Sequence, residues 1–286
     1  MRKPREEIWY RRRHAAPVGL HVTVYDLFGV RAIDTEHQLF STLQLIIAPH
    51  VHVCVTRDGC VLLDLKRDKY LGLGRAETEL LAGAIDDWPK PNWDAVADPA
   101  GEGGNQASTE ELCRRLEADG MLIAGRGEGG CPAREPLPSM GREWVSVGDE
   151  LEVPGRIDLE AVVNFVAAFV WARWSLGWRP MSSVVQSVRE RKIQRGGITE
   201  PTEILGLATA VGVFRRLRPF LFAAENRCLL HALTLVRFLS CYDFYPDWLF
   251  GVATQPWAAH SWVQWGDYLL DSNPEKVCRY TPILAV

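Results

Sequence analysis

Residues 258–274 read AAHSWVQWGDYLLDSNP and place one His and one Asp on either side of a Gly-Asp dipeptide. A two-residue turn at that dipeptide pairs the flanking segments as an antiparallel hairpin. Because side chains alternate between the two faces of a strand, His260, Trp262 and Asp271 then share one face. His260 and Asp271 become diagonal cross-strand neighbours within side-chain reach. The spacing therefore predicts a carboxylate that orients an imidazole.

Upstream, the segment ENRCLLHALTLVRFLSC (225–241) carries apolar residues at helical spacing and predicts a helix that begins near Asn226. Asn226 is a suitable N-cap and would put Cys228 in the first turn. The helix dipole and the unpaired backbone N–H groups of that turn favour the thiolate, which is the nucleophilic form of cysteine. On position alone, a small core residue is the alternative interpretation of this thiol.

The order of these residues points to a catalytic site. An imidazole held by Asp271 needs only a thiol on its other nitrogen, and a helix-start Cys followed by a His-and-Asp hairpin is the transglutaminase-like arrangement. His231 follows Cys228 by three positions and is a competing base, although we expect no carboxylate to orient it. Cys241, at the end of the same helix, is interpreted as a packing residue. A structural role for His260 remains the alternative.

Composition bounds the class of protein. At 286 residues, 47% apolar and 24% charged, the chain is globular and long enough for one large domain or two ordinary ones. Its seven cysteines form no CxxC pair, follow no zinc-ligand spacing and are preceded by no obvious secretory leader. We therefore expect a reducing, cytoplasmic setting, in which a cysteine either fills the core or acts as a nucleophile.

A small sheet-and-helix unit is predicted over residues 51–125. The segment VHVCVTRDGCVLLDL (51–65) has an Asp-Gly turn between two alternating runs, which is a strong hairpin signal. A second reversal leads into a third strand at YLGLG (70–74), and helical spacing follows at 75–88 and 108–122. Three short strands with two helices make a winged-helix-like unit.

A Gly- and Pro-rich segment without periodicity, AGRGEGGCPAREPLPSMGR (124–142), marks a domain boundary. Helical patterns follow at 157–176, 180–193 and 201–217, and strands come last, which is an α+β order. The basic segment that opens the chain has no clear periodicity, and a basic arm that binds a membrane or a partner is the alternative to a poorly ordered extension. The predicted parts are an extension of uncertain order (1–50), the winged-helix-like domain (51–125), a linker (126–142) and a transglutaminase-like, papain-like domain (143–286).

Charge and length argue against two classes of partner. Residues 51–125 carry eight Lys or Arg against fourteen Asp or Glu, a net charge of −6. That balance argues against nucleic acid, because affinity for DNA comes largely from neutralised phosphates. The most apolar stretch, AVVNFVAAFVWARW (161–174), is interrupted by Asn164 and Arg173 and falls short of the roughly 20 residues that span a bilayer. It predicts a buried helix and no membrane span.

Two stretches of the second domain resemble a known family. The helix start CLLHALTLVRFLS (228–240) and the segment GVATQPWAAHSWVQWGDYLLD (251–271) are similar to the fused leader peptidases of lasso-peptide biosynthesis, the B proteins of the microcin-processing type. The resemblance covers residues 157–286. Ser261 replaces the usual Ala and Trp257 stands where Phe is more common, and neither departure touches a catalytic group.

The resemblance implies a cysteine peptidase that hydrolyses the bond between the leader and the core of a precursor peptide. Cys228 would be the nucleophile, His260 the general base and acid, and Asp271 the orienting carboxylate. Backbone N–H groups at the helix start would stabilise the oxyanion. Trp262 is expected to wall the substrate groove or to shield the His-Asp pair, with core packing as an equal alternative. No metal or other cofactor is implied.

The amino-terminal unit likewise resembles the leader-recognition element of ribosomal peptide pathways, similar to the small chaperone of pyrroloquinoline-quinone biosynthesis. Its matching pieces are DGCVLLDLKRDKYLGLG (58–74) and STEELCRRLEADGML (108–122). An open third strand would accept an extended leader by strand addition. The residues expected to bind the leader, with a core role as the alternative for each, are Tyr70, Leu71, Leu73, Leu112 and Leu116.

The partners that the resemblance implies are a lasso precursor peptide and an ATP-dependent cyclase similar to asparagine synthetase. Two other functions remain open. If an amine replaces water in the second step, the same three residues make a transglutaminase-like acyltransferase. If the three residues are inactive, the chain is a non-catalytic scaffold that presents the precursor to the cyclase.

Overall fold

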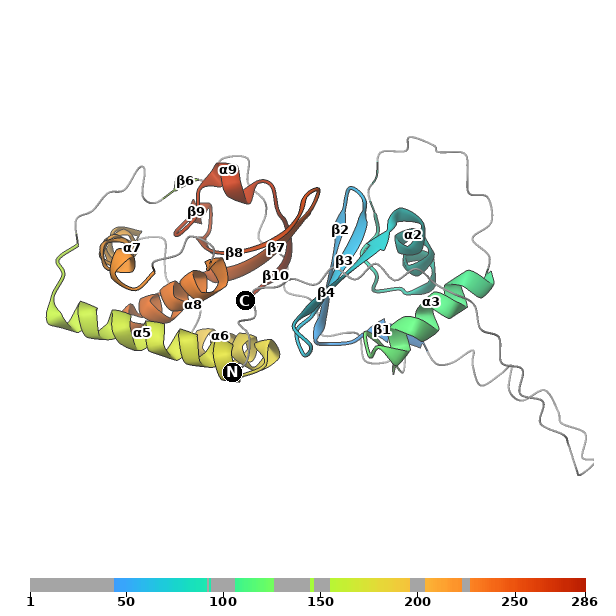
Figure 1. Ribbon diagram of the computed structural model, residues 1–286, viewed down its shortest axis with the longest axis horizontal. Helices are drawn as coiled ribbons and strands as arrows, with labels where there is room; N and C mark the ends of the chain where they lie inside the picture. Colours follow the sequence, from blue (N-terminus) through green and yellow to red (C-terminus); the bar gives the residue numbers. More distant parts are fainter. Residues whose placement is uncertain are drawn as a thin grey trace, which may run out of the picture. The chain divides into compact units, whose positions relative to one another are not determined.

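The computed structural model describes residues 44–91, 93, 106–125, 145–146, 155–195, 204–222 and 227–286. They belong to one compact unit, Thr42–Val286. The fold is α+β, as expected, with a small β-sheet region followed by a larger region of helices and sheet (Figure 1). Most of the extension 1–50 and the whole linker 126–142 lie outside the described residues, and the expected division into domains stays a prediction.

The small region is built on a three-stranded antiparallel sheet in the order β2-β3-β4. Its strands are β2 (Val51–Thr56), β3 (Gly59–Asp64) and β4 (Lys69–Gly74). The predicted Asp-Gly hairpin between β2 and β3 is confirmed. Gly59 closes this turn with a φ of 144°, and a Cβ there would lie 1.9 Å from the backbone oxygen of Leu73. Only glycine fits that position.

Helices α2 (Arg75–Ala84) and α3 (Gln106–Ala118) pack on one face of this sheet. A second, two-stranded sheet pairs β1 (Gln44–Ile47) with β5 (Leu122–Gly125). Part of the expected extension, residues 44–50, therefore belongs to this small region. No local pattern predicts this pair, because its two strands are far apart in the sequence. The core of the small region includes Leu62, Leu73, Leu81, Leu112 and Leu116.

Four helices open the larger region, close to the spans predicted from periodicity. Asp158 caps the first of them by accepting a hydrogen bond from the backbone N–H of Ala161 (2.8 Å). The rings of Phe165, Phe214 and Phe238 lie 5.4–6.2 Å apart between centroids and join three of the helices in one core. The four helices are α5 (Leu159–Trp178), α6 (Met181–Gln194), α7 (Ile204–Leu217) and α8 (Cys228–Leu239).

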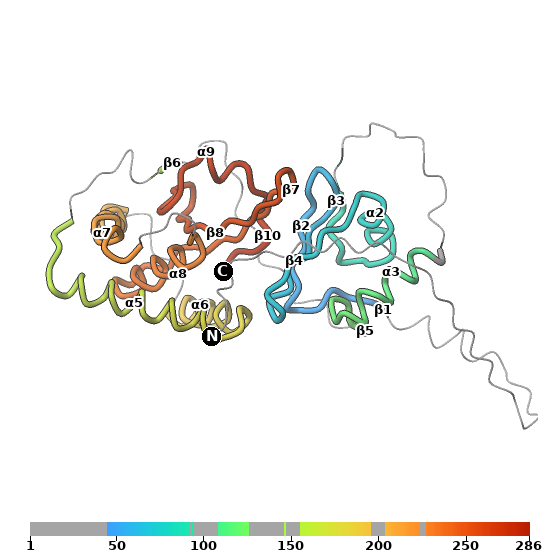
Figure 2. Tube along the Cα trace, viewed as in Figure 1, coloured from blue at the N-terminus to red at the C-terminus, as the bar shows by residue number. Residues whose placement is uncertain are grey.

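A five-stranded sheet in the order β10-β7-β8-β9-β6 completes the larger region. The chain runs from α8 through β7 and β8 and ends in β10 (Figure 2). All neighbouring strands are antiparallel except β6 and β9, which are parallel. Its elements are β6 (Val145–Ser146), β7 (Asp247–Thr254), β8 (Trp257–Trp265), β9 (Tyr268–Leu269), the short helix α9 (Pro274–Val277) and β10 (Thr281–Ala285).

The two faces of this sheet pack in different clusters. Trp248 and Val263 lie in the main core with the residues of α8. Leu249 and Trp262 pack on the other side, in a smaller cluster to which α9 contributes. His260, two residues before Trp262, shares that second face because side chains alternate along β8. Helix α8 therefore covers the face of β8 opposite to that of His260.

Helix α5 is longer and less buried than predicted. It has 20 residues, and by length and composition it is apolar enough to cross a membrane, with 28% of its apolar window buried. Phe165 and Ala172 pack in the main core, whereas Val163, Val170 and Trp174 are exposed. The expectation of a buried helix too short for a bilayer is therefore wrong. A core helix of a globular domain passes the same test, and the contacts of Phe165 favour that interpretation.

Gly251 provides a test of this packing. It pairs with His260, and a Cβ at this position would lie 2.7 Å from the Trp262 ring and 3.0 Å from Cβ of Tyr280. We expect Gly251→Ala to lower the free energy of unfolding by about 1–3 kcal/mol, because the buried ring must shift. Urea unfolding followed by tryptophan fluorescence measures the change. Gly72→Ala is the control, since nothing lies within 4 Å of a Cβ there. Equal losses in the two variants would contradict the role of the close approach.

Candidate active site

Cys228 is the first residue of α8 and is partly exposed, as the helix prediction required. The N-cap is Arg227 rather than the expected Asn226, and it makes no side-chain capping hydrogen bond. At this first position the backbone N–H of Cys228 has no acceptor within the helix, and the helix dipole favours an anion. No acidic side chain lies in the first turn. The helix start therefore suits a thiolate and an oxyanion.

The His-and-Asp hairpin has the predicted register only near its turn. Gln264 pairs with Leu269 as expected, but β9 ends at Leu269, before Asp271 is reached. The expected strand pairing that makes His260 and Asp271 diagonal neighbours is therefore wrong. Instead the side chain of Asp271 lies at the edge of β8 beyond the end of β9. There its Oδ1 accepts a hydrogen bond from the backbone N–H of Val263 (2.9 Å).

The second oxygen of Asp271 lies against His231. Oδ2 of Asp271 is 3.4 Å from Nδ1 of His231, and the two side chains are 2% and 11% exposed. The expectation that no carboxylate orients His231 is therefore wrong. The ring of His231 also lies edge-on to Phe214 and Phe222, with centroids 5.3 Å apart in both cases. Its Nε2 is buried and has no hydrogen-bond partner within the described residues.

His260 lies in a separate, largely apolar setting. It is 7% exposed, and its Nε2 is 3.3 Å from Oγ of Ser272. Its ring stacks near that of Trp262, with centroids 6.1 Å apart, and lies 5.2 Å from the ring of Tyr280. The ladder that would have brought His260 and Asp271 together as cross-strand neighbours ends too early, so the nearest polar side chain is Ser272.

The charge state of His260 follows from this environment. The pKa of its imidazole is lowered to about 4, mainly by burial and to a smaller extent by the charges of Lys276 and His231, while Asp271 acts in the opposite direction. His260 is therefore neutral at pH 7 and able to accept a proton. Asp271 and His231 both lie close enough to act on this imidazole electrostatically.

Trp262 is a core residue. It is fully buried, and its indole N–H donates to Oε1 of Gln264 (3.4 Å). Because none of its surface is exposed, Trp262 does not wall a groove in this structure; it packs in the smaller cluster, and its role as a shield of the His-Asp pair stays a prediction. Its stacking on His260 adds an apolar wall to one side of the imidazole.

The predicted catalytic groups are thus only partly brought together. Asp271 binds His231 and the edge of β8, and His260 lies beside Ser272. Within the described residues, the thiol of Cys228 makes no hydrogen bond to either imidazole. Because α8 covers the face of β8 opposite to His260, the packing of the described residues does not bring His260 to Cys228, and their contact stays a prediction. The sequence did not predict the contact of His231 with Asp271, because α8 and the end of β9 are far apart along the chain.

Three of the five residues expected to bind a leader belong to the core of the small region. Leu73, Leu112 and Leu116 are 5%, 6% and 0% exposed. Their prediction as groove-lining residues is therefore wrong, because none of them presents a side chain to a ligand in this structure. Leu71 is partly exposed at the edge strand β4.

Tyr70 packs toward the larger region. Its ring lies edge-on to that of Trp257, with centroids 5.8 Å apart. Burial raises the pKa of the Tyr70 hydroxyl, and the negative charges of Asp68 and of the Cys228 thiolate add to this effect. Such an interaction requires proximity. Tyr70, on the edge strand β4, therefore lies on the side of the small sheet nearest to Cys228.

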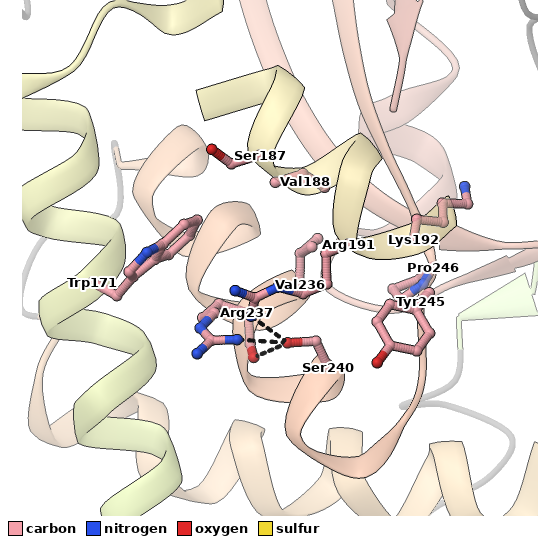
Figure 3. Close-up of a pocket in the computed structure, with 10 residues that line it drawn as sticks. All are labelled: Trp171, Ser187, Val188, Arg191, Lys192, Val236, Arg237, Ser240, Tyr245 and Pro246. Atoms are coloured by element: carbon pink, nitrogen blue, oxygen red, sulfur yellow. Dashed lines mark hydrogen bonds between the residues drawn. The ribbon is translucent and has the colours of Figure 1, made fainter. Parts of the chain in front are cut away.

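A basic pocket between α6 and α8 lies apart from these residues (Figure 3). Arg191 and Arg237 approach the hydroxyl of Ser240, at 3.5 and 3.2 Å, and the Arg237 guanidinium lies 5.6 Å from the ring centroid of Trp171. None of the predicted catalytic residues lines this pocket. In the described part of the chain, no group of three or more His, Cys, Asp or Glu residues could hold a metal ion.

Comparison with known families gives a match for most of the larger region. Residues 164–285 match the family described as Transglutaminase-like superfamily, and the match includes Cys228, His260 and Asp271. The carboxyl-terminal half of the chain therefore contains a transglutaminase-like core domain, which suggests a cysteine protease or acyltransferase type of activity. Neither the curated proteins nor the solved structures yield a match to this chain.

The low pKa of His260 predicts a dependence of stability on pH. The unfolded imidazole, with a pKa near 6.5, binds a proton more readily than the folded one, with a pKa of about 4. The stability contributed by the neutral ring is complete above pH 6.5 and is lost as the pH falls toward 4. The loss amounts to something on the order of 3 kcal/mol.

Urea unfolding at pH 7 and pH 4.5 measures this change, and an NMR titration measures the pKa of His260 directly. His260→Gln should remove most of the change in the free energy of unfolding between these two pH values. A smaller dependence of stability on pH should remain from His50, because burial also lowers the pKa of its imidazole. An NMR midpoint near 6.5 for His260 would contradict its burial.

Proposed function

We propose that this protein is a cysteine peptidase that removes the leader from a lasso precursor peptide. The observation that carries the proposal is the position of Cys228, the first residue of a helix inside a transglutaminase-like core domain. A thiol at that position has the dipole and the free N–H groups that a nucleophile of acyl transfer needs. The small β-sheet region supplies a second element, an edge strand able to hold an extended peptide.

In the proposed reaction the sulfur of Cys228 attacks the carbonyl carbon of the scissile bond while His260 takes the thiol proton. The backbone N–H of Cys228 stabilises the oxyanion that forms. His260 then gives its proton to the departing amine, and a thioester remains on the sulfur. Water hydrolyses the thioester, which regenerates the thiol and releases the leader as a carboxylic acid. Contacts between such groups often tighten only when substrate binds.

The leader would bind at β4. Within the described residues, β3 is the one strand that pairs with β4, so its other edge is open. Hydrogen bonding alternates along an antiparallel strand, and Gly74 donates its N–H to Oε2 of Glu77 (3.0 Å) rather than to β3. By the same alternation, the N–H groups of Gly72 and Tyr70 point to the open edge. An extended peptide can pair with them.

The partners and the compartment are part of the same proposal. The substrate is the lasso precursor, and the freed amine of its core passes to an ATP-dependent cyclase similar to asparagine synthetase. The expected compartment is the cytoplasm. The contacts of α5 with the main core support a protein that functions outside the bilayer.

Cys228→Ala should lower cleavage of a lasso precursor peptide by at least about 10³-fold, because the nucleophile is lost. Mass spectrometry of the products measures the reaction, and a shortened core with a free amine is expected from the unaltered protein. Cys241→Ala is the matched control, since this exposed thiol lies just after the end of α8. It should retain full activity.

The same assay separates the other functions. Loss of ammonia with a retained leader would identify an acyltransferase. A Cys228→Ala variant that still supports production of the lasso peptide would identify a scaffold. Either result would overturn the proposed hydrolysis.

Gly72→Pro tests strand addition, because proline removes one N–H from the open edge of β4. We expect the KM for the precursor to rise about tenfold with kcat within about twofold, since an edge strand tolerates a proline whose N–H faced solvent. Steady-state kinetics give both constants, and thermal unfolding checks the fold. Gly72→Ala keeps the N–H and should behave as the unaltered protein. An unchanged KM in the proline variant would place the leader elsewhere.

A further inference from the structure

Asp271 makes one hydrogen bond and one close contact to groups that lie outside the predicted catalytic trio. Its Oδ1 accepts the backbone N–H of Val263 at 2.9 Å, and its Oδ2 lies 3.4 Å from Nδ1 of His231. The carboxylate side chain is 2% exposed. A buried carboxylate is costly unless it has polar partners, so these two contacts determine where it lies.

The surroundings of His231 indicate which of its nitrogens carries the proton. Nε2 is buried and has no partner within the described residues, and the ring lies between Phe214 and Phe222. A proton on Nε2 would therefore leave a buried donor unpaired, whereas a proton on Nδ1 faces the carboxylate. The contacts assign a neutral ring with its hydrogen on Nδ1.

Asp271 keeps room for a third donor. The two oxygens of a carboxylate accept about four hydrogen bonds, so the contacts with Val263 and His231 leave capacity for another donor. Nε2 of His260 lies 3.3 Å from Oγ of Ser272, the residue that follows Asp271 in the chain, so His260 lies close to this carboxylate. A carboxylate fixed from one side can orient an imidazole on its other side.

We propose that His231 is a positioning residue, whose Nδ1–H fixes the Asp271 carboxylate where it can orient the catalytic imidazole of His260. This inference rests on the proposed peptidase function. A role for His231 as the base itself is disfavoured, because its Nε2 is buried and makes no hydrogen bond to the thiol of Cys228.

Paired substitutions of His231 test the proposal. His231→Asn keeps an N–H near the position of Nδ1, and its kcat should stay within about tenfold of the unaltered protein. His231→Leu removes the donor, and its kcat should fall about 10²-fold with KM within about twofold, since small displacements of a catalytic group have effects of this size. Steady-state cleavage of the precursor by the full chain gives both constants.

Thr234→Val is the matched control, because Thr234 is a buried polar residue one turn further along α8 whose hydroxyl binds the backbone oxygen of Leu230. It should keep full activity. If His231→Leu does not fold, His231→Gln replaces it, because the glutamine amide lies too far along the side chain to take the place of Nδ1. The same loss of kcat is then expected.

Two kinetic results would overturn the proposal. Full activity in both His231→Asn and His231→Leu would mean that Asp271 needs no imidazole to position it. Loss in both variants as deep as in Cys228→Ala, with cleavage retained by His260→Gln, would make His231 the base rather than a positioning residue.

An NMR experiment tests the contact without any substrate. In the ¹⁵N-labelled full chain, the His231 ring should give the pattern of a neutral imidazole protonated on Nδ1, and His231→Asn identifies its signals. Asp271→Ala should abolish that pattern. An unchanged pattern would overturn the proposed contact. If the unaltered protein cleaves no precursor, the peptidase function fails, and this spectrum still decides whether His231 holds Asp271.

Discussion

The buried carboxylate of Asp271 joins the free edge of β8 to helix α8. Where β9 ends, one carboxylate oxygen replaces the missing strand as the acceptor for the Val263 N–H, so a backbone donor inside the protein is not left unpaired. The other oxygen faces His231, one helical turn after Cys228. A single side chain therefore ends a strand and fixes the helix that presents the candidate nucleophile against the sheet.

The electrostatics of the region follow from this arrangement. The start of α8 favours a negative sulfur, but burial keeps His260 neutral, with a pKa of about 4. A preformed pair of thiolate and imidazolium is costly in such a setting, because a protonated ring would need a partner inside an apolar wall that includes Trp262. The environment favours a reaction in which the proton leaves the sulfur as attack begins, as in general base catalysis.

Features specified by neighbouring residues were predictable from the sequence, and those that join distant segments were not. Periodicity located the four helices of the larger region, and the Asp-Gly turn located the first hairpin. The alternation of side chains along the strand predicted that His260 and Trp262 share one face. The spacing of residues in the sequence did not predict that helix α9 packs on that face. The contact of Asp271 with His231 and the pairing of β1 with β5 join residues far apart in the chain. An apolar pattern also cannot tell a core leucine from a groove leucine, as Leu116 demonstrates.

The burial of the small sheet limits how it can bind a peptide. One face of β3 packs in the core of the small region and the other face packs in the main core. The open edge of β4 is therefore the part of this sheet that a peptide can reach. Recognition there depends on backbone groups and on few side chains. Tyr70 is the second residue of β4, and it lies near both Trp257 and Cys228. A leader that pairs antiparallel with β4 would leave the strand at the end where Tyr70 lies, because antiparallel strands run in opposite directions. The proposed function therefore requires antiparallel addition, which directs the segment after the leader toward the thiol, whereas parallel addition would direct it away.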